Sequence, residues 1–402
     1  MLSFTDARKK VVEIVTAMHA HPPVETVDLS RASGRVLAAD IAADRDYPPF
    51  NRSTRDGFAV RSADLASPGA TLQRIGEIKA GGHFDGAIAA GQCVQIMTGA
   101  PVPSDTDAVI MIEFSKLDAD GQRVTFERAA STGQNIVPRG SEAHAAEKLL
   151  SSGTRLGYAE MALAAQVGAA QVKTFVPPRV AILSTGDEVV DVSAKPGPFQ
   201  VRNGNGVALE TLVAQAGAWP VQLGNAVDDV DVLRRAIEKG LQADALILSG
   251  GVSMGKYDLV EKVLGELGAE FFFDGVAIRP GRPAVFGRCQ GKPVFGLPGN
   301  PVSTMVTFEL FVVPALDLLS CAPARALKIC GARLAHPVKE KGALTHFLPA
   351  RVDWTDGEPV VGVMSWQGSG DTVTLARANA LLVIPADRPE WQAGEWVGVI
   401  AR

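Results

Sequence analysis

The segment VAILSTGDE (180–188) is the strongest indication of the fold, because a run of buried-strand residues passes directly into a polar loop that contains glycine. The same pairing recurs in ALILSGG (245–251) and in VFGLPGNP (294–301). Helical patterns alternate with these and other short strand patterns, over residues 207–216, 230–241, 258–267 and 302–319. The alternation predicts a three-layer α/β domain with a largely parallel sheet.

Strand-rich segments flank this domain on both sides. Residues 21–175 are rich in turns, and short strand patterns such as 108–113 and 124–126 are separated by glycine and proline signals. Pro177-Pro178 marks the boundary with the α/β pattern. Beyond Pro323 the short strands and turns return, and they predict a small β-barrel or sandwich. The expected fold class is therefore α/β plus β-rich domains.

The composition excludes several classes of protein. The 402 residues are 47% hydrophobic, which excludes a disordered chain, and a net charge of -5 excludes a nucleic-acid coat or a membrane-surface protein. The four cysteines form no CxxC pair, as expected for free thiols in a reducing compartment. The apolar window 305–319 contains Glu309, Pro314 and Asp317, which a membrane helix would not carry. We therefore expect a cytoplasmic protein with neither a nucleic-acid nor a membrane partner.

Three polar loops, 184–188, 249–255 and 297–301, follow predicted strands. Ligands of an open parallel sheet bind beyond the carboxyl ends of its strands. Three glycines and two serines in the middle loop offer N–H and hydroxyl groups to an anion. Glu188 and Asp258 could hold Mg²⁺ against a phosphate, although Asp258 could instead only cap a helix. One such loop is more typical of an ordinary connection, but three together favour a phosphate or pterin-type ligand.

Other stretches carry weaker signals. In IRPGRP (278–283), two arginines held by prolines suit phosphate or another oxyanion, with a solvated turn as the alternative. GVSMG (251–255) fits the G-x-S-x-G motif of serine hydrolases, and His336 and His346 follow it. That alternative is disfavoured, because the next helix is expected only near residue 258 and no histidine follows a strand of the same sheet. The chain has no Walker A motif and no HExxH zinc motif.

Six motifs follow one another along the chain: DGFAV (56–60), IMTGAPVP (96–103), STGDE (184–188), SGGVSMGKYD (249–258), IRPGRP (278–283) and LPGNPVS (297–303). In this order they closely resemble the molybdopterin molybdenumtransferase family, the MoeA-type enzymes of molybdenum cofactor synthesis that are homologous to the C-terminal domain of gephyrin. Each motif alone is weak, but the ordered set is highly specific and spans nearly the whole chain.

The resemblance implies an elongated homodimer whose active site lies between the subunits. Each subunit would have a linking domain, an inserted β-rich domain, an α/β domain similar to molybdopterin adenylyltransferase, and a C-terminal β-barrel. The implied ranges are 1–45 with 141–176 (N-terminal helix and linking domain), 46–140 (inserted), 177–322 (α/β) and 323–402 (barrel). Molybdopterin adenylyltransferase and molybdoenzyme maturation proteins are the implied partners.

The implied reaction inserts molybdenum from molybdate into adenylylated molybdopterin, with Mg²⁺-dependent release of AMP. The implied catalytic residues are Asp56, Thr98, Glu188, Asp228 and Asp258. The implied metal ligands are Glu188, Asp258, Asp56 and Glu142. The implied substrate-binding residues are Ser249, Gly250, Gly251, Ser253, Gly255, Arg279, Arg282, Pro298, Asn300, Pro301 and Ser369. As an alternative role, Asp228 could simply start a helix.

The chain departs from the family pattern at several positions. Arg55 and Phe58 stand where methionine and tyrosine are usual, and Pro349 stands where an arginine is common. The linking-domain motif reads RGSE (139–142), so that Glu142 takes the place of an aspartate. A non-catalytic molybdopterin-binding or scaffold relative is the alternative function. Intact acidic residues at positions 56, 188 and 258 argue against it.

Overall fold

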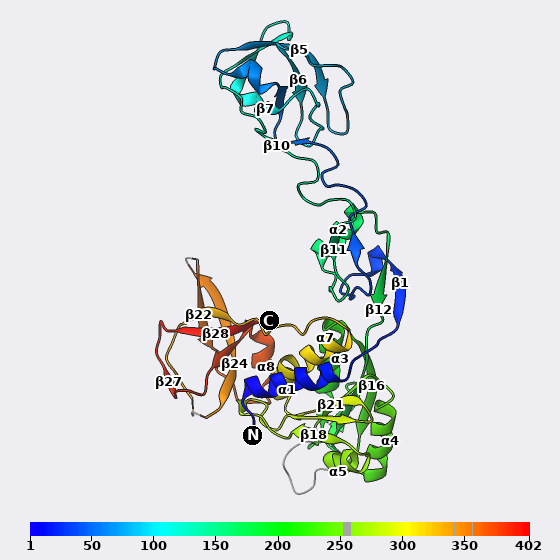
Figure 1. The fold of residues 1–402 in the computed structure, drawn as a ribbon. Helices are drawn as coiled ribbons and strands as arrows, with labels where there is room; N and C mark the ends of the chain where they lie inside the picture. Colours follow the sequence, from blue (N-terminus) through cyan, green and yellow to red (C-terminus); the bar gives the residue numbers. More distant parts are fainter. Residues whose placement is uncertain (252–258, 341–342, 356) are drawn as a thin grey trace.

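The computed structural model describes residues 1–251, 259–340, 343–355 and 357–402. Figure 1 shows an elongated molecule with a distal lobe at one end and a middle lobe next to it. An α/β lobe and a C-terminal barrel lie side by side at the other end. The expectation of an elongated chain with an α/β domain, an inserted β-rich domain and a barrel is confirmed.

The α/β lobe is built on a six-stranded sheet in the order β16–β13–β17–β21–β20–β18. The strands are β13 (Arg179–Thr185), β16 (Trp219–Ala226), β17 (Ala245–Ser249), β18 (Glu270–Phe273), β20 (Val285–Cys289) and β21 (Lys292–Leu297). The first four in spatial order are parallel, and β20 and β18 extend the sheet in antiparallel fashion. The prediction of a largely parallel sheet is therefore confirmed.

Helices cover both faces of this sheet. One face carries α3 (Gly204–Gln215), α6 (Pro301–Thr307), α7 (Val313–Leu319) and α1 (Phe4–Ala17), and the other carries α4 (Val230–Gly240) and α5 (Leu259–Glu266). Alternate residues of β13 point to opposite faces: Val180 and Ile182 pack in one core, and Ala181 and Leu183 in the other. These two cores make the three layers that the sequence predicts.

The packing of α1 differs from the grouping expected from the sequence. Residues 1–45 were expected with the linking domain, but Ala7, Val11 and Val15 of α1 are buried in a core of the α/β lobe. The apolar periodicity of a helix shows that it has a buried face but not which lobe covers that face. The expected domain boundaries themselves stay predictions.

The helix expected over 302–319 is interrupted by a π-helical stretch, Phe308–Val312, which lies between α6 and α7. Pro314 has no N–H to donate to the preceding turn, and a wider turn accommodates this loss. Residues Pro301–Leu319 are long and apolar enough to cross a membrane by composition, but this helix is largely buried in the α/β lobe.

The barrel contains β22 (Cys330–Leu334), β24 (Thr345–Thr355), β25 (Glu358–Val363), β26 (Ala380–Ile384) and β28 (Trp396–Ala401). It is closed because β26 pairs with both β28 and β24. A short strand of the preceding chain, β19 (Ile278–Arg279), pairs with β24 and joins the α/β lobe to the barrel. Smaller elements are β23 (Val338–Lys339), β27 (Glu390–Trp391) and α8 (Thr372–Arg377).

The distal lobe has a six-stranded sheet in the order β7–β4–β6–β5–β9–β8. Its strands are β4 (Gly57–Val60), β5 (Thr71–Ile78), β6 (Gln92–Ile96), β7 (Ala108–Met111), β8 (Ser115–Leu117) and β9 (Arg123–Phe126). The middle lobe contains β1 (Val24–Asp28), β2 (Ile41–Ala42), β11 (Lys148–Leu150), β12 (Gln171–Phe175) and α2 (Tyr158–Gln166). Paired strands β3 (Arg52–Ser53) and β10 (Ile136–Val137) connect the two lobes, as expected for an inserted domain.

A buried carboxylate links the middle lobe to the α/β lobe. Asp317 of α7 is fully buried, and its Oδ1 lies 3.0 Å from Arg155 Nη2 and 2.8 Å from Arg325 Nη2. Arg155 belongs to the middle lobe, whereas Arg325 belongs to the segment that leads into the barrel. Three parts of the chain therefore meet at one side chain.

Candidate functional site

The carboxyl ends of β13, β17 and β21 open into a cleft of about 790 Å³. The cleft lining includes residues at or just beyond the end of each of these strands, namely Ser184–Gly186 with Glu188, Ser249–Gly251 and Pro298–Pro301. Asn203–Asn205 and Asp228 also line this cavity, which we call the carboxylate cleft. The structure therefore brings together the described parts of the three loops that the sequence predicts as ligand-facing.

The glycines after β17 let the chain pass close to the end of β13. Gly250 and Gly251 have φ of +95° and +61°. A Cβ on Gly250 would lie 2.7 Å from the carbonyl oxygen of Thr185, so no larger residue fits. However, the N–H of Gly250 donates to the carbonyl of Leu297. This amide is therefore occupied and is not one of the N–H groups that the loop can offer to an anion.

Two carboxylates of the cleft lining, those of Glu188 and Asp228, lie near a third, that of Asp187. Asp187 and Glu188 follow β13, and the N–H of Asp228 donates to Asp187 Oδ1 at 3.0 Å. The pKa of Asp228 is raised, first by partial burial and then by the negative charges of Asp187 and Glu188. The helix cap that the sequence allowed for Asp228 is made by Asp229, whose Oδ1 accepts from the N–H groups of Asp231 and Val232. Asp228 is therefore left facing the cleft.

Three of the expected site residues, Ser253, Gly255 and Asp258, lie outside the described residues. The serine of the hydrolase alternative is among them. Of its two histidines, His346 is on the barrel strand β24, 3.2 Å from Glu340 Oε2, and His336 follows β22. Both histidines therefore belong to the barrel rather than to the α/β sheet.

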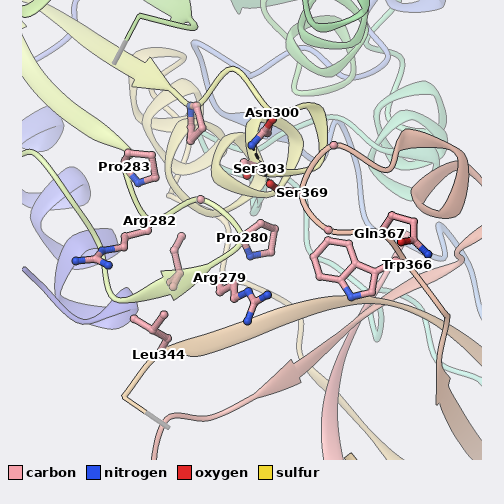
Figure 2. A pocket seen from close by; sticks show the side chains of 15 residues that line it. Arg279, Pro280, Arg282, Pro283, Asn300, Ser303, Leu344, Trp366, Gln367 and Ser369 are labelled. Carbon is pink, nitrogen blue, oxygen red and sulfur yellow. Dashed lines mark hydrogen bonds between the residues drawn. The ribbon is translucent and has the colours of Figure 1, made fainter. Parts of the chain in front are cut away.

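A second cavity of about 460 Å³, the arginine pocket, adjoins the cleft (Figure 2). Its lining includes Arg279, Arg282, Ser303, Trp366 and Ser369, and it shares Pro283, Pro298, Asn300 and Gly370 with the carboxylate cleft. Figure 2 shows the Arg279 side chain on the side of Trp366, whereas that of Arg282 extends the opposite way. The two arginines therefore do not converge, and their expected role toward phosphate or another oxyanion stays a prediction.

Hydrogen bonds connect the barrel to the lining of the arginine pocket. Asn300 Nδ2 donates to Ser369 Oγ at 2.9 Å, and the N–H of Val302 donates to the carbonyl of Ser369. The Arg279 guanidinium lies 3.8 Å from the Glu340 carboxylate. Arg279 is about half exposed, so its remaining N–H groups are available to an anion.

Asp56 and Thr98 meet in the distal lobe. The N–H of Thr98 donates to Asp56 Oδ1 at 2.6 Å, and hydrogen bonds from the backbone and then the side chain of Thr98 lower the pKa of Asp56. Phe58 is buried and packs edge-on against Phe126, so this departure from the family pattern lies in the core of the lobe. Glu142 pairs with Arg52 at 3.0 Å between the distal and middle lobes.

The structure does not bring these distal residues to the cleft of the same chain. The middle lobe lies between the distal lobe and the α/β lobe in Figure 1. Within the described ranges of the chain, no group of three or more His, Cys, Asp or Glu side chains is arranged to hold a metal ion. The metal-ligand roles expected for Glu188, Asp56 and Glu142 stay predictions.

Sequence reasoning missed several polar residues of the cleft, among them Arg202, Thr185 and Asn205. Thr185 Oγ1 and Asn205 Oδ1 are buried, have no hydrogen-bond partner within the part of the chain that the structure describes, and both residues line the cleft. Thr185 belongs to the polar segment 184–188, but the sequence pattern gives this residue no role of its own. Asn205 lies in Gly204-Asn205-Gly206, where the local pattern shows only a turn into a helix. Its position after a parallel strand was the one available signal.

Three family models match the chain. They are described as the MoeA N-terminal region (domain I and II) at residues 2–168, a probable molybdopterin binding domain at 181–318, and the MoeA C-terminal region (domain IV) at 331–401. A Bacillus subtilis protein named molybdopterin molybdenumtransferase is 34% identical over 386 residues, which cover 94% of this chain and 89% of that protein. A Staphylococcus aureus protein of the same name is 32% identical and covers 98% and 94%.

Solved structures resemble the whole chain as well. A molybdopterin biosynthesis MoeA protein from Pyrococcus horikoshii superposes with a TM-score of 0.78 at 28% identity, covering all of both chains. A second MoeA structure from the genus Pyrococcus gives 0.72 at 33% identity, covering 100% of this chain and 99% of the other. The similarity in sequence and the similarity in fold therefore both extend over nearly the whole chain.

Proposed function

The chain belongs to the molybdopterin molybdenumtransferase family, enzymes of molybdenum cofactor biosynthesis, and from that premise we propose the reaction of this protein. It inserts molybdenum from molybdate into adenylylated molybdopterin and releases AMP, with Mg²⁺ as cofactor. The observation that carries this proposal is the pair of adjoining cavities that share Pro283, Pro298, Asn300 and Gly370. One cavity offers carboxylates and hydroxyls, and the other offers a cationic side chain and further hydroxyls. Two substrates can therefore lie next to each other.

The donor set of the carboxylate cleft fits a magnesium ion. Mg²⁺ takes oxygen ligands and is usually held by one or two carboxylates together with substrate phosphates. Glu188 and Asp228 supply such oxygens, and the pKa of Asp228 is raised by burial and by the negative charges of Asp187 and Glu188. When bound, the ion would neutralise charge on the phosphoanhydride. Asp258 is a further proposed ligand.

The hydroxyls and the arginine bind and orient oxyanions. Arg279 offers planar N–H donors that match a tetrahedral oxyanion such as molybdate. Ser369 Oγ accepts from Asn300, which leaves its hydrogen free for a substrate oxygen. Pro298 and Pro301 shape the loop that carries Asn300, and Pro301 begins α6.

A second copy of the chain completes this site in our proposal. Asp56 and Thr98 lie in the distal lobe, beyond the middle lobe from their own cleft, so they would act on the cleft of a partner subunit. The lowered pKa of Asp56 keeps its carboxylate charged, which suits a second cation or proton transfer. We further propose a cytoplasmic enzyme. A molybdopterin adenylyltransferase would supply its substrate, and maturation proteins of molybdoenzymes would take its product.

Release of AMP from adenylylated molybdopterin, with molybdate and Mg²⁺, tests the proposal. We expect molybdate-dependent release by the wild type and its loss in Asp56→Asn and Glu188→Gln. Asp118→Asn is a matched control, because Asp118 of the distal lobe also accepts backbone N–H groups, from Gln122 and Arg123. If the wild type binds the adenylate but never releases AMP, the transferase proposal is wrong and the scaffold alternative takes its place.

A further inference from the structure

Asn205 holds together two loops that face the carboxylate cleft. It lies in the first turn of α3, and its Nδ2 donates to Ser249 Oγ at 2.9 Å and to the carbonyl of Gly299 at 2.8 Å. A carbonyl oxygen only accepts hydrogen bonds, so the amide nitrogen must face Gly299 and the orientation of the side chain is fixed. One side chain thus spans the ends of β17 and β21.

Both tied positions line the carboxylate cleft. Gly299 lies between Pro298 and Asn300, which line the arginine pocket as well. The loops already approach closely here, since a Cβ on Gly299 would lie 3.5 Å from Gly250 Cα. The Asn205 amide therefore fixes the separation of the two loops at the junction of the two cavities.

The acceptor end of the same side chain argues against a purely structural role. Asn205 Oδ1 is buried and has no hydrogen-bond partner among the described residues, and burying an unpaired acceptor costs free energy. Residues that break such a local rule are expected mainly at functional sites. Donation into Ser249 Oγ also occupies an acceptor site of that hydroxyl, so its single hydrogen is left to donate to a substrate oxygen.

We propose that Asn205 is a positioning residue that sets the spacing between adenylylated molybdopterin in the carboxylate cleft and molybdate in the arginine pocket. This inference rests on the proposed function and deepens it. A displacement of about 1 Å between reacting groups can lower a rate about 100-fold without a comparable change in binding. Loss of Asn205 therefore affects turnover more than the binding of either substrate.

Asn205→Leu is the main test variant, because leucine keeps a branched side chain of similar size, adds no charge and cannot donate. Asn205→Ala provides a second variant without added apolar surface. Asn379→Leu is the matched control, since Asn379 makes a similar amide clamp, but on Val352 of the barrel. We expect kcat to fall about 10- to 100-fold in both Asn205 variants. The Kd of adenylylated molybdopterin, measured by calorimetry without molybdate, should change less than about threefold.

Two results would overturn the inference while the wild type still releases AMP. One is a kcat within about twofold of the wild type in both Asn205 variants. The other is a loss confined to adenylate binding with an unchanged kcat at saturation, which would make Asn205 a binding residue instead.

A binding measurement tests the inference even if the protein does not catalyse the proposed reaction. Calorimetry compares molybdate binding with and without AMP, in the wild type and in Asn205→Leu. We expect each ligand to change the affinity for the other in the wild type, and this coupling to disappear in the variant. Absence of coupling in a wild type that also lacks AMP release would overturn the inference, as would coupling that the variant retains.

Discussion

Asp317 and Asp228 both belong to the α/β lobe, but their surroundings differ. Asp317 is fully buried between the guanidinium groups of Arg155 and Arg325, and it also accepts the backbone N–H of Arg325. Asp228 lies at the edge of the carboxylate cleft, where burial and two negative neighbours raise its pKa. Asp317 therefore has two cationic partners, whereas the charges that raise the pKa of Asp228 are both negative.

This difference separates structure from function in one lobe. A buried carboxylate with two cationic partners stabilises the fold only while all partners are present. Carboxylates kept near one another without a cation oppose folding, and perturbed pKa values of this kind cluster at functional sites. We therefore propose that Asp317 serves stability and Asp228 serves ligand binding, and the following predictions test that division.

The largest effect is expected on removing Asp317. Asp317→Ala leaves two partly buried guanidinium groups without their anion, and we expect the free energy of unfolding to fall by about 3–5 kcal/mol. Urea unfolding followed by circular dichroism measures this change. The exposed Asp118→Ala serves as control, with an expected change of less than about 1 kcal/mol. A loss of that same small size in Asp317→Ala would contradict the structural role.

Asp228→Asn is expected to lower activity without lowering the stability of the fold. It should lower kcat for AMP release about 100-fold, which is the scale for losing one charged group that acts on the transition state. The free energy of unfolding should stay the same or rise, because the repulsion with Asp187 and Glu188 is relieved. The neighbouring Asp229→Ala is the matched control. It removes the cap of α4 and should cost about 1 kcal/mol of stability while most activity remains. Equal activities of the two variants would contradict the division.

Magnesium should stabilise the wild type by a smaller amount. At about ten times its Kd, an ion that binds only the folded state adds about 1.4 kcal/mol to the free energy of unfolding. We expect this gain in the wild type and its loss in the double variant Glu188→Gln, Asp228→Asn, with ionic strength matched by sodium chloride. If magnesium stabilises the wild type and the double variant equally, the ion binds at another site.

The smallest effects are expected in the pH dependence of stability, with opposite signs at two sites. The raised pKa of Asp228 favours the folded state below the ordinary aspartate pKa of about 4, and this contribution is lost as pH rises through the raised value. The lowered pKa of Asp56 favours the folded state above about pH 4, and this contribution is lost as pH falls. Raising the pH should therefore favour Asp228→Asn over the wild type and disfavour Asp56→Asn. Urea unfolding across this range measures both slopes, and slopes of the same sign would contradict the comparison.

Local pattern was sufficient to predict most of the fold. The β13, β17 and β21 patterns and their polar loops placed the cleft correctly, because side-chain alternation and strand-to-loop transitions are local properties. The lobe that covers α1 and the π-helical turn at Phe308–Val312 were not predicted. Both depend on packing between distant segments, which a single sequence does not encode in any short window.

The site was predictable in residue type but not in arrangement. The sequence indicated carboxylates, glycines and arginines near one edge of the sheet. It could not show that Asp229 caps α4 and so frees Asp228, or that Arg279 and Arg282 extend in different directions. Nor could it show the amide clamp of Asn205, because Ser249 and Gly299 are 44 and 94 residues away along the chain.

Mixing two inactive variants tests most directly whether the site is completed by a second chain. Asp56→Asn keeps an intact cleft, and Glu188→Gln keeps an intact distal lobe, so a dimer with one chain of each has one complete site. Random reassociation makes about half of the dimers mixed, and we therefore expect about one quarter of the wild-type rate of AMP release to return. A mixture that stays as inactive as either variant alone would contradict a site shared between subunits.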